Sequence, residues 1–531
     1  MTEYYSSGMP VSEISPEEQE RIRRIKESID KMESQNFLRE NNCNSPEDIS
    51  LSCREKLNSA QKLAITTIEG PLLVIAGAGS GKTHTLTNRV AFMLEKGIPA
   101  HKILLLTFTK KAAMEMKNRV CKIIPKNHSF DFTAGTFHSF ANLMMRQYSK
   151  IIGIPASFSI IDTTDSKDLI GMILKKKNFT SSVLPRKNTI AKYISRARNF
   201  EKSVGDVIKE ERPSLENCLY ELEETALEYE KYKRANNLMD YDDLLEIFLD
   251  QLKTNQLFLE KIRQRFSFVL VDEYQDTNIC QKKILNIMTS EHRNIMVVGD
   301  DCQSIYGFRG ACVENILLFH EDWHDAKLVK LEQNYRSTQE ILDFTNAIVS
   351  SSVTGYKKKL FSEHKRGEIP EIKTFDSPEK EAEYIADKIN SSEKKYGMKN
   401  IAVLYRSSYH GNFIQAELLK QRISFVTRGG LKFNERMHVK DCMAYLRAAS
   451  NPCDQISWSR ILRLVSGVGN VTTTKILSRI HSDPKNPDIS AFKNRKFYKK
   501  LSETISLVKS LSENRNNPQK LLDTVYEHYF P

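Results

Sequence analysis

A glycine-rich stretch directly after an apolar run constrains this chain more than any other feature. Residues 72–75 are apolar without interruption, which is typical of a strand buried on both faces of a parallel sheet. They are followed by residues 76–83, Ala-Gly-Ala-Gly-Ser-Gly-Lys-Thr, and then by a helical spacing of apolar residues. Glycines let the backbone turn tightly and direct successive N–H groups into one concavity that binds phosphate. The stretch therefore predicts a strand, a phosphate loop and a helix of an α/β fold.

Individual residues of this loop have predicted roles. Lys82 is expected to reach the β- and γ-phosphates of a nucleotide, and the Thr83 hydroxyl is expected to bind Mg²⁺. The helix that begins there favours anions at its N-terminus. Ala76 replaces the usual first glycine, and a chance glycine-rich turn is the alternative interpretation. The predicted nucleotide-binding residues of the loop are Ala76, Gly77, Ala78, Gly79, Ser80, Gly81, Lys82, Thr83 and His84.

Length and composition restrict the class of protein. At 531 residues the chain is too long for one hydrophobic core and suggests three or four domains. No apolar run approaches the roughly 20 residues that span a bilayer, so no membrane partner is expected. Nine scattered cysteines without a CxxC pair favour reduced thiols in a cytoplasm. The net charge of +12 fits either a phosphate-rich partner or a lysine-rich solvated surface.

A second strand end predicts the catalytic carboxylates. In residues 268–273, Phe-Val-Leu-Val-Asp-Glu, an apolar strand ends in two adjacent acids. Asp272 is expected to hold Mg²⁺, directly or through water, and Glu273 to take a proton from an attacking water. Two acids at a strand end are common by themselves, but here they follow a phosphate loop in the same chain.

Other strand ends carry polar residues at the edge where open α/β sheets bind ligands. Gln303 is expected to sense a γ-phosphate, and Arg336 is a candidate arginine finger that neutralises charge on the transferred phosphoryl group. Tyr335 is expected to stack on adenine. The amide of Gln61, one short helix ahead of the loop, is expected to bind adenine, although a glutamine by itself is more often a surface residue.

Aromatic and polar residues at the same kind of strand end predict a nucleic-acid surface. Phe108, Tyr306 and Phe308 are expected to stack on bases, and Thr109 and Lys110 to contact phosphates. The alternative is that the aromatic residues belong to the hydrophobic core. The predicted nucleic-acid contacts are Phe108, Thr109, Lys110, His138, Tyr306 and Phe308.

Residues from about 141 to 240 have a helical and basic pattern. This pattern predicts a helical insertion, with either a cationic face or an ordinary solvated helix face. The basic residues that suggest such a face are Arg186, Lys187, Lys192, Arg196 and Arg198.

With these residues in place, the chain resembles the UvrD/Rep branch of superfamily 1 DNA helicases. The matching segments in chain order are Gln61, AGAGSGKT, TFTKKAA, GTFHS, VDEYQDTN, VGDDCQSIYGFRGA and LEQNYRST. The resemblance implies RecA-like motor domains that close on ATP, and movement from 3′ to 5′ along single-stranded DNA. It also implies binding at single-strand/duplex junctions. The implied ATPase residues are Lys82, Thr83, Asp272, Glu273, Gln303 and Arg336.

The resemblance implies an α/β fold of P-loop, RecA-like parallel-sheet motor domains with helical insertions. The first motor domain is expected in two parts, separated by the first insertion, and a charged helical extension precedes it. The expected segments are 1–55 (extension), 56–140 and 251–330 (first motor domain), 141–250 (first insertion), 331–430 (second motor domain) and 431–531 (second insertion).

The resemblance is expected to fail toward the end of the chain. Two family motifs, resembling T-x-H-x-x-K-G-L-E and Y-V-x-x-T-R-A, are not found in residues 431–531. The second motor domain is therefore expected to be incomplete, either cut short or completed by a second polypeptide. Two functions follow: an ATP- and Mg²⁺-dependent 3′–5′ helicase, or a nucleotide-gated single-stranded-DNA-binding or adaptor module without helicase activity. A cytoplasmic location is expected, with nucleoid association if the source is bacterial or archaeal.

Overall fold

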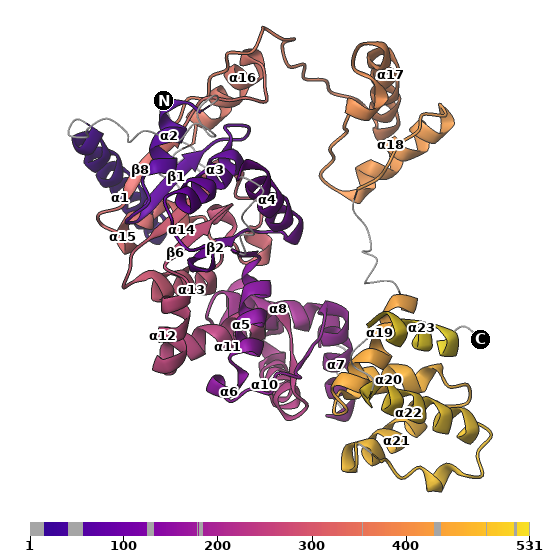
Figure 1. The fold of residues 1–531 in the computed structure, drawn as a ribbon. Helices are drawn as coiled ribbons and strands as arrows, with labels where there is room; N and C mark the ends of the chain where they lie inside the picture. The colour runs from indigo at the N-terminus through magenta and orange to yellow at the C-terminus, as the bar shows by residue number, and fades with distance from the viewer. Residues whose placement is uncertain are drawn as a thin grey trace. The chain divides into compact units, whose positions relative to one another are not determined.

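A computed structural model of the chain forms two compact units (Figure 1). The larger comprises Met1–Gly367 and Asp441–Pro531, and the smaller comprises Glu368–Lys440. The structure describes residues 15–40, 57–124, 132–177, 179, 184–352, 354–428, 437–484, 486–513 and 518–529. The domain boundaries predicted at 55/56 and 430/431 lie outside these residues. The predicted domain boundaries as a whole stay predictions.

A six-stranded, wholly parallel sheet forms the centre of the larger unit, in the order β3-β2-β6-β7-β1-β8. The strands are β1 (Leu72–Ala76), β2 (Ile103–Leu106), β3 (Thr133–Gly135), β6 (Phe268–Val271), β7 (Ile295–Gly299) and β8 (Lys327–Leu331). Every residue of β1, β2 and β7 is buried, as the apolar runs predict. Because the strands are parallel, their carboxyl ends meet at one edge, where the loops with the predicted site residues converge.

Helices cover both faces of this sheet because the strand side chains alternate between the faces. Leu72 and Val74 pack on one face with α2, α3 and α4, whereas Leu73 and Ile75 pack on the other face with α1, α5, α11, α13, α14 and α15. The bounds are α1 (Pro16–Glu40), α2 (Ser59–Thr66), α3 (Lys82–Glu95), α4 (Lys110–Ile123), α5 (Phe137–Gln147), α11 (Tyr241–Thr254), α13 (Ile279–Thr289), α14 (Glu314–Leu317) and α15 (Phe319–Asp322).

A helical segment is inserted between β3 and β6 and has its own core around Leu169, Ile190 and Leu222. Two short parallel strands join it, β4 (Ser159–Ile160) and β5 (Leu238–Met239). Its further helices are α6 (Ser149–Ile152), α7 (Thr163–Lys176), α8 (Lys187–Asn199), α9 (Val204–Glu211), α10 (Leu219–Ala235) and α12 (Gln256–Arg265).

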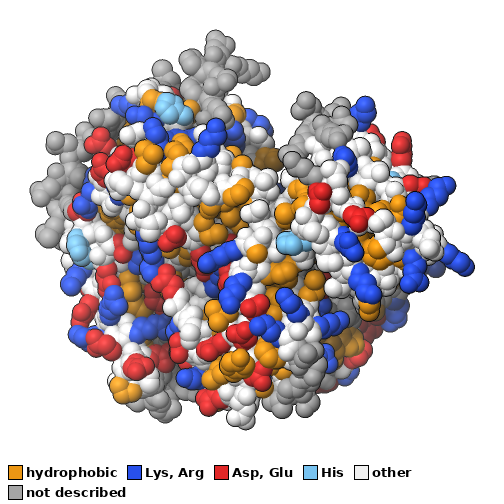
Figure 2. Space-filling view, turned by 90° about the horizontal axis from the view of Figure 1, so that it is seen from below, with side chains coloured by type: hydrophobic (Ala, Val, Ile, Leu, Met, Phe, Trp, Pro, Cys, Tyr) orange, Lys and Arg blue, Asp and Glu red, His pale blue; other side chains and the backbone are white. Residues whose placement is uncertain are grey.

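Three of the five basic residues that suggested an open cationic face are paired with acidic residues. Arg198 pairs with Asp240, Asp243 and Glu246 inside the insertion. Lys187 and Arg196 also form ion pairs, with Asp168 and Glu211. Over most of the surface drawn in Figure 2, Lys and Arg side chains are interspersed with Asp and Glu side chains.

The last helices pack around Trp458, Ile461 and Leu501. They are α19 (Met437–Ser450), α20 (Gln455–Leu464), α21 (Asn470–Ser482), α22 (Tyr498–Glu513) and α23 (Pro518–Tyr529). The Arg447 guanidinium on α19 lies 2.6 Å from the Asp165 carboxylate on α7, so this segment contacts the insertion. No helix in the described part of the chain is long and apolar enough to cross a membrane.

The smaller unit is built on α17 (Pro378–Tyr396) and α18 (Ser408–Lys420). Its core contains Ala382, Ala386, Ile414 and Leu418. A RecA-like, parallel-sheet motor domain was expected over residues 331–430, but none of the described residues of the smaller unit belongs to a strand, including the apolar run at residues 401–404. Leu404 is 94% exposed there, so the apolar run does not form a buried strand.

Candidate active site

The phosphate loop connects β1 to α3, as predicted. Gly79 and Gly81 have φ values of 77° and 88°, the left-handed region that favours glycine. A Cβ atom added at Gly81 would lie 2.7 Å from Nε2 of Gln61, and one at Gly79 would lie 2.7 Å from Cβ of Arg336. The Ser80 hydroxyl donates to the Gly77 carbonyl at 2.8 Å. The backbone conformation and the close neighbours at Gly79 and Gly81 therefore require glycine, as a phosphate-binding loop does.

Gln61 lies beside this loop and is 1% exposed. Its Nε2 donates to the Ser80 carbonyl at 3.3 Å, and its Oε1 accepts from the Asn58 backbone N–H at 3.2 Å. Asn58 caps α2, and its Nδ2 donates to the Tyr335 hydroxyl at 3.1 Å. The two residues predicted to bind adenine are therefore linked through Asn58, to which the sequence analysis gave no role.

The two predicted carboxylates follow β6 and face the loop. Lys82 Nζ pairs with Glu273 Oε2 at 3.0 Å. Glu273 has a φ of 51°, an uncommon conformation for a residue with a side chain and typical of functional sites. Burial and the neighbouring Glu273 raise the pKa of Asp272 to about 7, and its Oδ1 is buried without a hydrogen-bond partner. Burial also raises the pKa of Asp276, to about 6.

One pocket of about 330 Å³ lies against these groups. Predicted nucleotide residues and predicted nucleic-acid residues line it together: Thr83, Asp272, Glu273, Gln303, Phe108, Thr109 and Tyr306. His84, Lys110 and His138 are not among its lining residues. The strand ends that were far apart in the sequence therefore meet in one cavity.

Hydrogen bonds join the end of β6 to the end of β7 in this pocket. Gln275 Nε2 donates to Glu273 Oε2 at 3.0 Å, and its Oε1 accepts from the Asp300 backbone N–H at 3.0 Å. Gln303 Nε2 donates to Asp300 Oδ2 at 2.6 Å. No role was predicted for Gln275, although its position two residues after Glu273 could have indicated a contact with that carboxylate.

The segment after β8 closes on the phosphate loop. The Tyr335 backbone N–H donates to the Gly79 carbonyl at 2.9 Å, and Asn334 Nδ2 donates to the Ala78 carbonyl at 2.6 Å. Asn334 Oδ1 also accepts from the backbone N–H of Arg336. Arg336 is exposed and lies in the same compact unit as the loop. Asn334 thus fixes the approach of Arg336, and the sequence analysis did not identify it.

Three predicted base-stacking residues form a continuous row. The rings of Phe108 and Tyr306 have centroids 4.7 Å apart, and those of Tyr306 and Phe308 have centroids 6.0 Å apart. Phe308 is 64% exposed, so this side chain is not part of the core. Thr109 caps α4 through a hydrogen bond from the Ala112 N–H, and Lys110 beside it is exposed.

The two histidines occupy different surroundings. His138 on α5 meets the Tyr241 ring edge-on at 5.9 Å, and burial lowers its pKa to about 4. The imidazole is therefore neutral near pH 7 and offers no cation to a phosphate. Burial also lowers the pKa of His84, whose ring lies 3.2 Å from Asn88 Nδ2.

Comparisons with known proteins agree with this geometry. Residues 57–324 match the UvrD/REP helicase N-terminal domain, and residues 329–529 match the UvrD-like helicase C-terminal domain. The ATP-dependent DNA helicase PcrA of Staphylococcus epidermidis is 36% identical over 430 residues, which cover 80% of this chain and 58% of that protein. The ATP-dependent DNA helicase PcrA of Staphylococcus aureus is 36% identical over 428 residues, which cover 79% of this chain and 57% of that protein.

The match to the C-terminal domain corrects one expectation. The second motor domain and its insertion were expected to be incomplete, but the C-terminal domain model is matched over residues 329–529. The expectation depended on two short motifs, whereas the domain match rests on about 200 residues of pattern. The chain spans 57 to 58% of the length of these relatives. Together the two domain matches cover most of the sequence, and the chain belongs to the UvrD/Rep helicase family.

Proposed function

We propose that this chain is an ATP-dependent DNA helicase or translocase that moves from 3′ to 5′ along single-stranded DNA. The observation that carries the proposal is the shared pocket. The phosphate-loop residue Thr83, the carboxylates of Asp272 and Glu273, and the aromatic rings of Phe108 and Tyr306 all line it. A change in nucleotide state on one wall therefore acts directly on the groups that hold a strand on the other wall.

Lys82 and Glu273 are assigned complementary roles in hydrolysis. Lys82 Nζ is paired with Glu273 Oε2 at 3.0 Å. Phosphate oxygens of ATP give Lys82 a new partner and release Glu273, which then accepts a proton from the attacking water. Gln303 and Arg336 contact the γ-phosphate, and Gln61 and Tyr335 hold adenine.

The residues present fit a magnesium ion. Asp272 Oδ1 is buried without a hydrogen-bond partner, an arrangement that is costly for an ionised carboxylate unless a cation is bound. Thr83, the second assigned ligand, lines the same pocket. Magnesium, when bound, neutralises charge on the β- and γ-phosphates.

Single-stranded DNA and single-strand/duplex junctions are the proposed partners. The row of Phe108, Tyr306 and Phe308 supports stacking of successive bases, which tolerates any sequence. A second polypeptide is not part of the proposal, because the match to the C-terminal domain removes its motivation. A cytoplasmic location, with nucleoid association in a bacterial or archaeal cell, remains part of the proposal.

The test is ATP hydrolysis by the purified chain with and without single-stranded DNA, beside Lys82→Ala and Glu273→Gln. We expect DNA to stimulate hydrolysis, and each substitution to lower the rate by about 10³-fold. Glu273→Gln should retain ATP binding, because glutamine keeps the shape of the side chain but cannot take the proton. Binding of ATP and DNA without hydrolysis by the unsubstituted chain would favour the nucleotide-gated binding module instead.

A further inference from the structure

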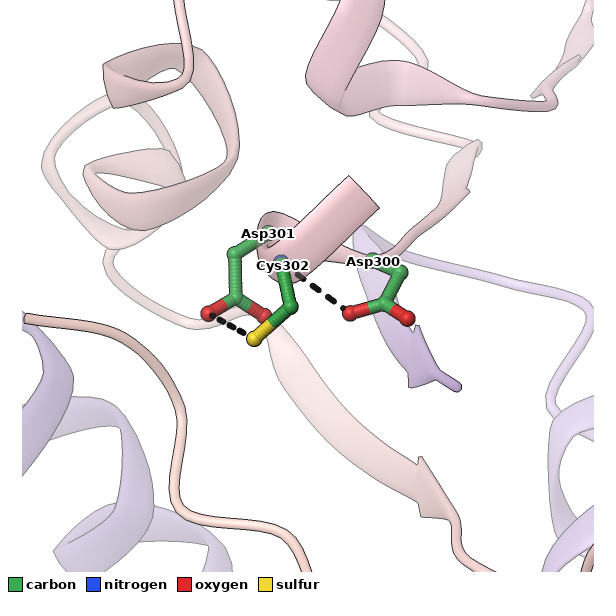
Figure 3. A group of neighbouring side chains, drawn as sticks. All are labelled: Asp300, Asp301 and Cys302. Atoms are coloured by element: carbon green, nitrogen blue, oxygen red, sulfur yellow. Dashed lines mark hydrogen bonds between the residues drawn. The ribbon is translucent and has the colours of Figure 1, made fainter. Parts of the chain in front are cut away.

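Two carboxylates and one thiol lie close together directly after β7, in the segment that carries Gln303. Asp300, Asp301 and Cys302 point toward a common region (Figure 3). The Cys302 backbone N–H donates to Asp300 Oδ1 at 3.1 Å, and its Sγ lies 3.8 Å from Asp301 Oδ2. Such a group resembles a metal site, but a cation of the chain is already there. Lys358 Nζ pairs with Asp300 Oδ1 and, at 2.7 Å, with Asp301 Oδ1.

The group of ion pairs formed by Lys358, Asp300 and Asp301 is well buried. The side chains of Lys358 and Asp300 are 5% exposed, and that of Asp301 is 4% exposed. Burial lowers the pKa of Lys358, but the two carboxylates outweigh it and hold the pKa above its ordinary value. Lys358 is therefore an ammonium. Its removal would leave two neighbouring carboxylates in a buried place without a counter-charge.

Lys358 reaches the nucleotide site only through other residues. It is not among the residues that line the pocket. Asp300, which it holds by Oδ1, accepts the Gln303 amide with Oδ2 at 2.6 Å. The backbone N–H of Asp300 is bound at the same time by Gln275, which contacts Glu273. The orientation of Asp300 therefore sets the position of the amide that is assigned to the γ-phosphate.

The segment that carries Lys358 is in turn held by α1, which lies next to β8 (Figure 1). Glu33 on α1 pairs with Lys330 Nζ on β8 at 2.7 Å, and Lys330 Nζ also donates to the Lys357 carbonyl at 2.7 Å. The buried Tyr356 ring packs in the same core as Ile29 of α1. Helix α1 ends at residue 40, before the match to the family model begins at residue 57.

We propose that Lys358 is a positioning residue that sets the geometry of Gln303 in the nucleotide site, and that α1 supports it through Glu33 and Lys330. The inference rests on the proposed ATPase function and deepens it. It gives the N-terminal helix, which lies outside the family match, a part in controlling hydrolysis.

The main test compares Lys358→Met with Lys359→Met in the full chain. Lys359 is the matched control, because it has the same side chain one position later and is exposed. In DNA-stimulated ATP hydrolysis, Lys358→Met should lower kcat at least about tenfold with little change in KM, because only γ-phosphate sensing is misplaced. Lys359→Met should behave as the unsubstituted chain. Glu33→Gln should give a smaller loss of kcat, about two- to tenfold.

A second readout keeps the inference separate from the proposed function. Hydrogen exchange of the backbone over residues 299–310, without nucleotide, should be faster in Lys358→Met and unchanged in Lys359→Met. If the unsubstituted chain does not hydrolyse ATP, the proposed function fails while the exchange comparison still tests the role of Lys358. If Lys358→Met does not fold, the double variant with Asp301→Asn leaves one uncompensated carboxylate in place of two and should show the same kcat loss.

Three outcomes would overturn the inference. The first is a kcat and an exchange pattern in Lys358→Met like those of the unsubstituted chain. The second is an equal loss in Lys359→Met. The third is faster exchange throughout the larger unit, which would mean that Lys358 supports the whole fold and does not act on Gln303.

Discussion

The proposed nucleotide site and the helical insertion both bury charged residues, but they differ in how far these charges are paired. In the insertion, Lys233 is 1% exposed and its Nζ lies 2.7 Å from both Asp240 and Asp243. Arg198 adds a second cation to the same two carboxylates. In the proposed nucleotide site, Lys82 pairs with Glu273, and Oδ1 of the buried Asp272 has no hydrogen-bond partner among the residues that the structure describes.

This difference separates a structural group of charges from a binding site. A buried ion cluster whose members satisfy one another holds helices in place and has no capacity left for a ligand. A buried carboxylate that has an oxygen without a hydrogen-bond partner is costly by itself, and binding of a cation removes this cost. The comparison predicts that equivalent substitutions in the two regions will have opposite consequences for activity and stability.

The largest expected effect is on activity, from Asp272→Asn in the nucleotide site. Loss of this carboxylate removes the assigned magnesium ligand, so ATP hydrolysis should fall by about 10³-fold. The free energy of unfolding without nucleotide should stay the same or rise, because a buried carboxylate with an unsatisfied oxygen is removed. Steady-state hydrolysis and urea unfolding on the same samples measure both quantities. A large loss of stability would show that Asp272 belongs with the structural charges.

The next effect is on stability, from Asp240→Asn in the insertion. This change leaves Lys233 and Arg198 with one fewer buried counter-charge, and breaking such a group costs about 3 to 5 kcal/mol. Urea unfolding followed by circular dichroism measures the loss. The control is Asp168→Asn, whose pair with Lys187 is about half exposed and should contribute less than about 1 kcal/mol. Equal effects of the two substitutions would contradict the comparison.

The local part of the nucleotide site could be predicted from sequence. The apolar run before Gly77 indicates a parallel strand, and the carboxyl ends of parallel strands share an edge, so Asp272 and Gln303 had to approach the loop. The order of the motifs was therefore sufficient to place these groups together. No distance along the chain had to be known for that step.

Partners from distant segments could not be predicted. Arg198 belongs to a basic helix and suggested an open cationic face, because the acids that surround it are more than thirty positions away. Lys358 is the second of three consecutive lysines, and the sequence of that run does not indicate which lysine is buried. The expectation of an incomplete second motor domain was wrong for a related reason. It depended on two short motifs, whereas the domain match depends on the whole of residues 329–529.

Lowering the pH should reduce the stability that Asp240 contributes to the insertion. Although burial opposes them, Lys233 and Arg198 hold the pKa of Asp240 below its ordinary value. A carboxylate with a lowered folded-state pKa contributes stability that is complete above about pH 4 and is lost as the pH falls below that value. The stability difference between the unsubstituted chain and Asp240→Asn should therefore shrink by about 1 to 2 kcal/mol between pH 5 and pH 3. Urea unfolding at pH 7, 5 and 3 tests this, and a constant difference would contradict it.

The smallest effect is expected at the exposed border of the nucleotide site, where Phe308→Ala removes an aromatic ring but no charge. Stacking of a base on such a ring contributes about 1 to 3 kcal/mol, so the DNA concentration that gives half-maximal ATPase stimulation should rise by about tenfold or more. The rate at saturating DNA should stay the same, because Phe308 is not among the residues that line the pocket with Asp272, Glu273 and Gln303. Leu257→Ala is the control, since this apolar side chain on α12 is 53% exposed and lies outside the aromatic row. If both variants respond to DNA alike, the row of Phe108, Tyr306 and Phe308 is not the surface that holds the strand. The two buried regions would still differ in how fully their charges are paired, but the DNA would then bind at another edge of the pocket.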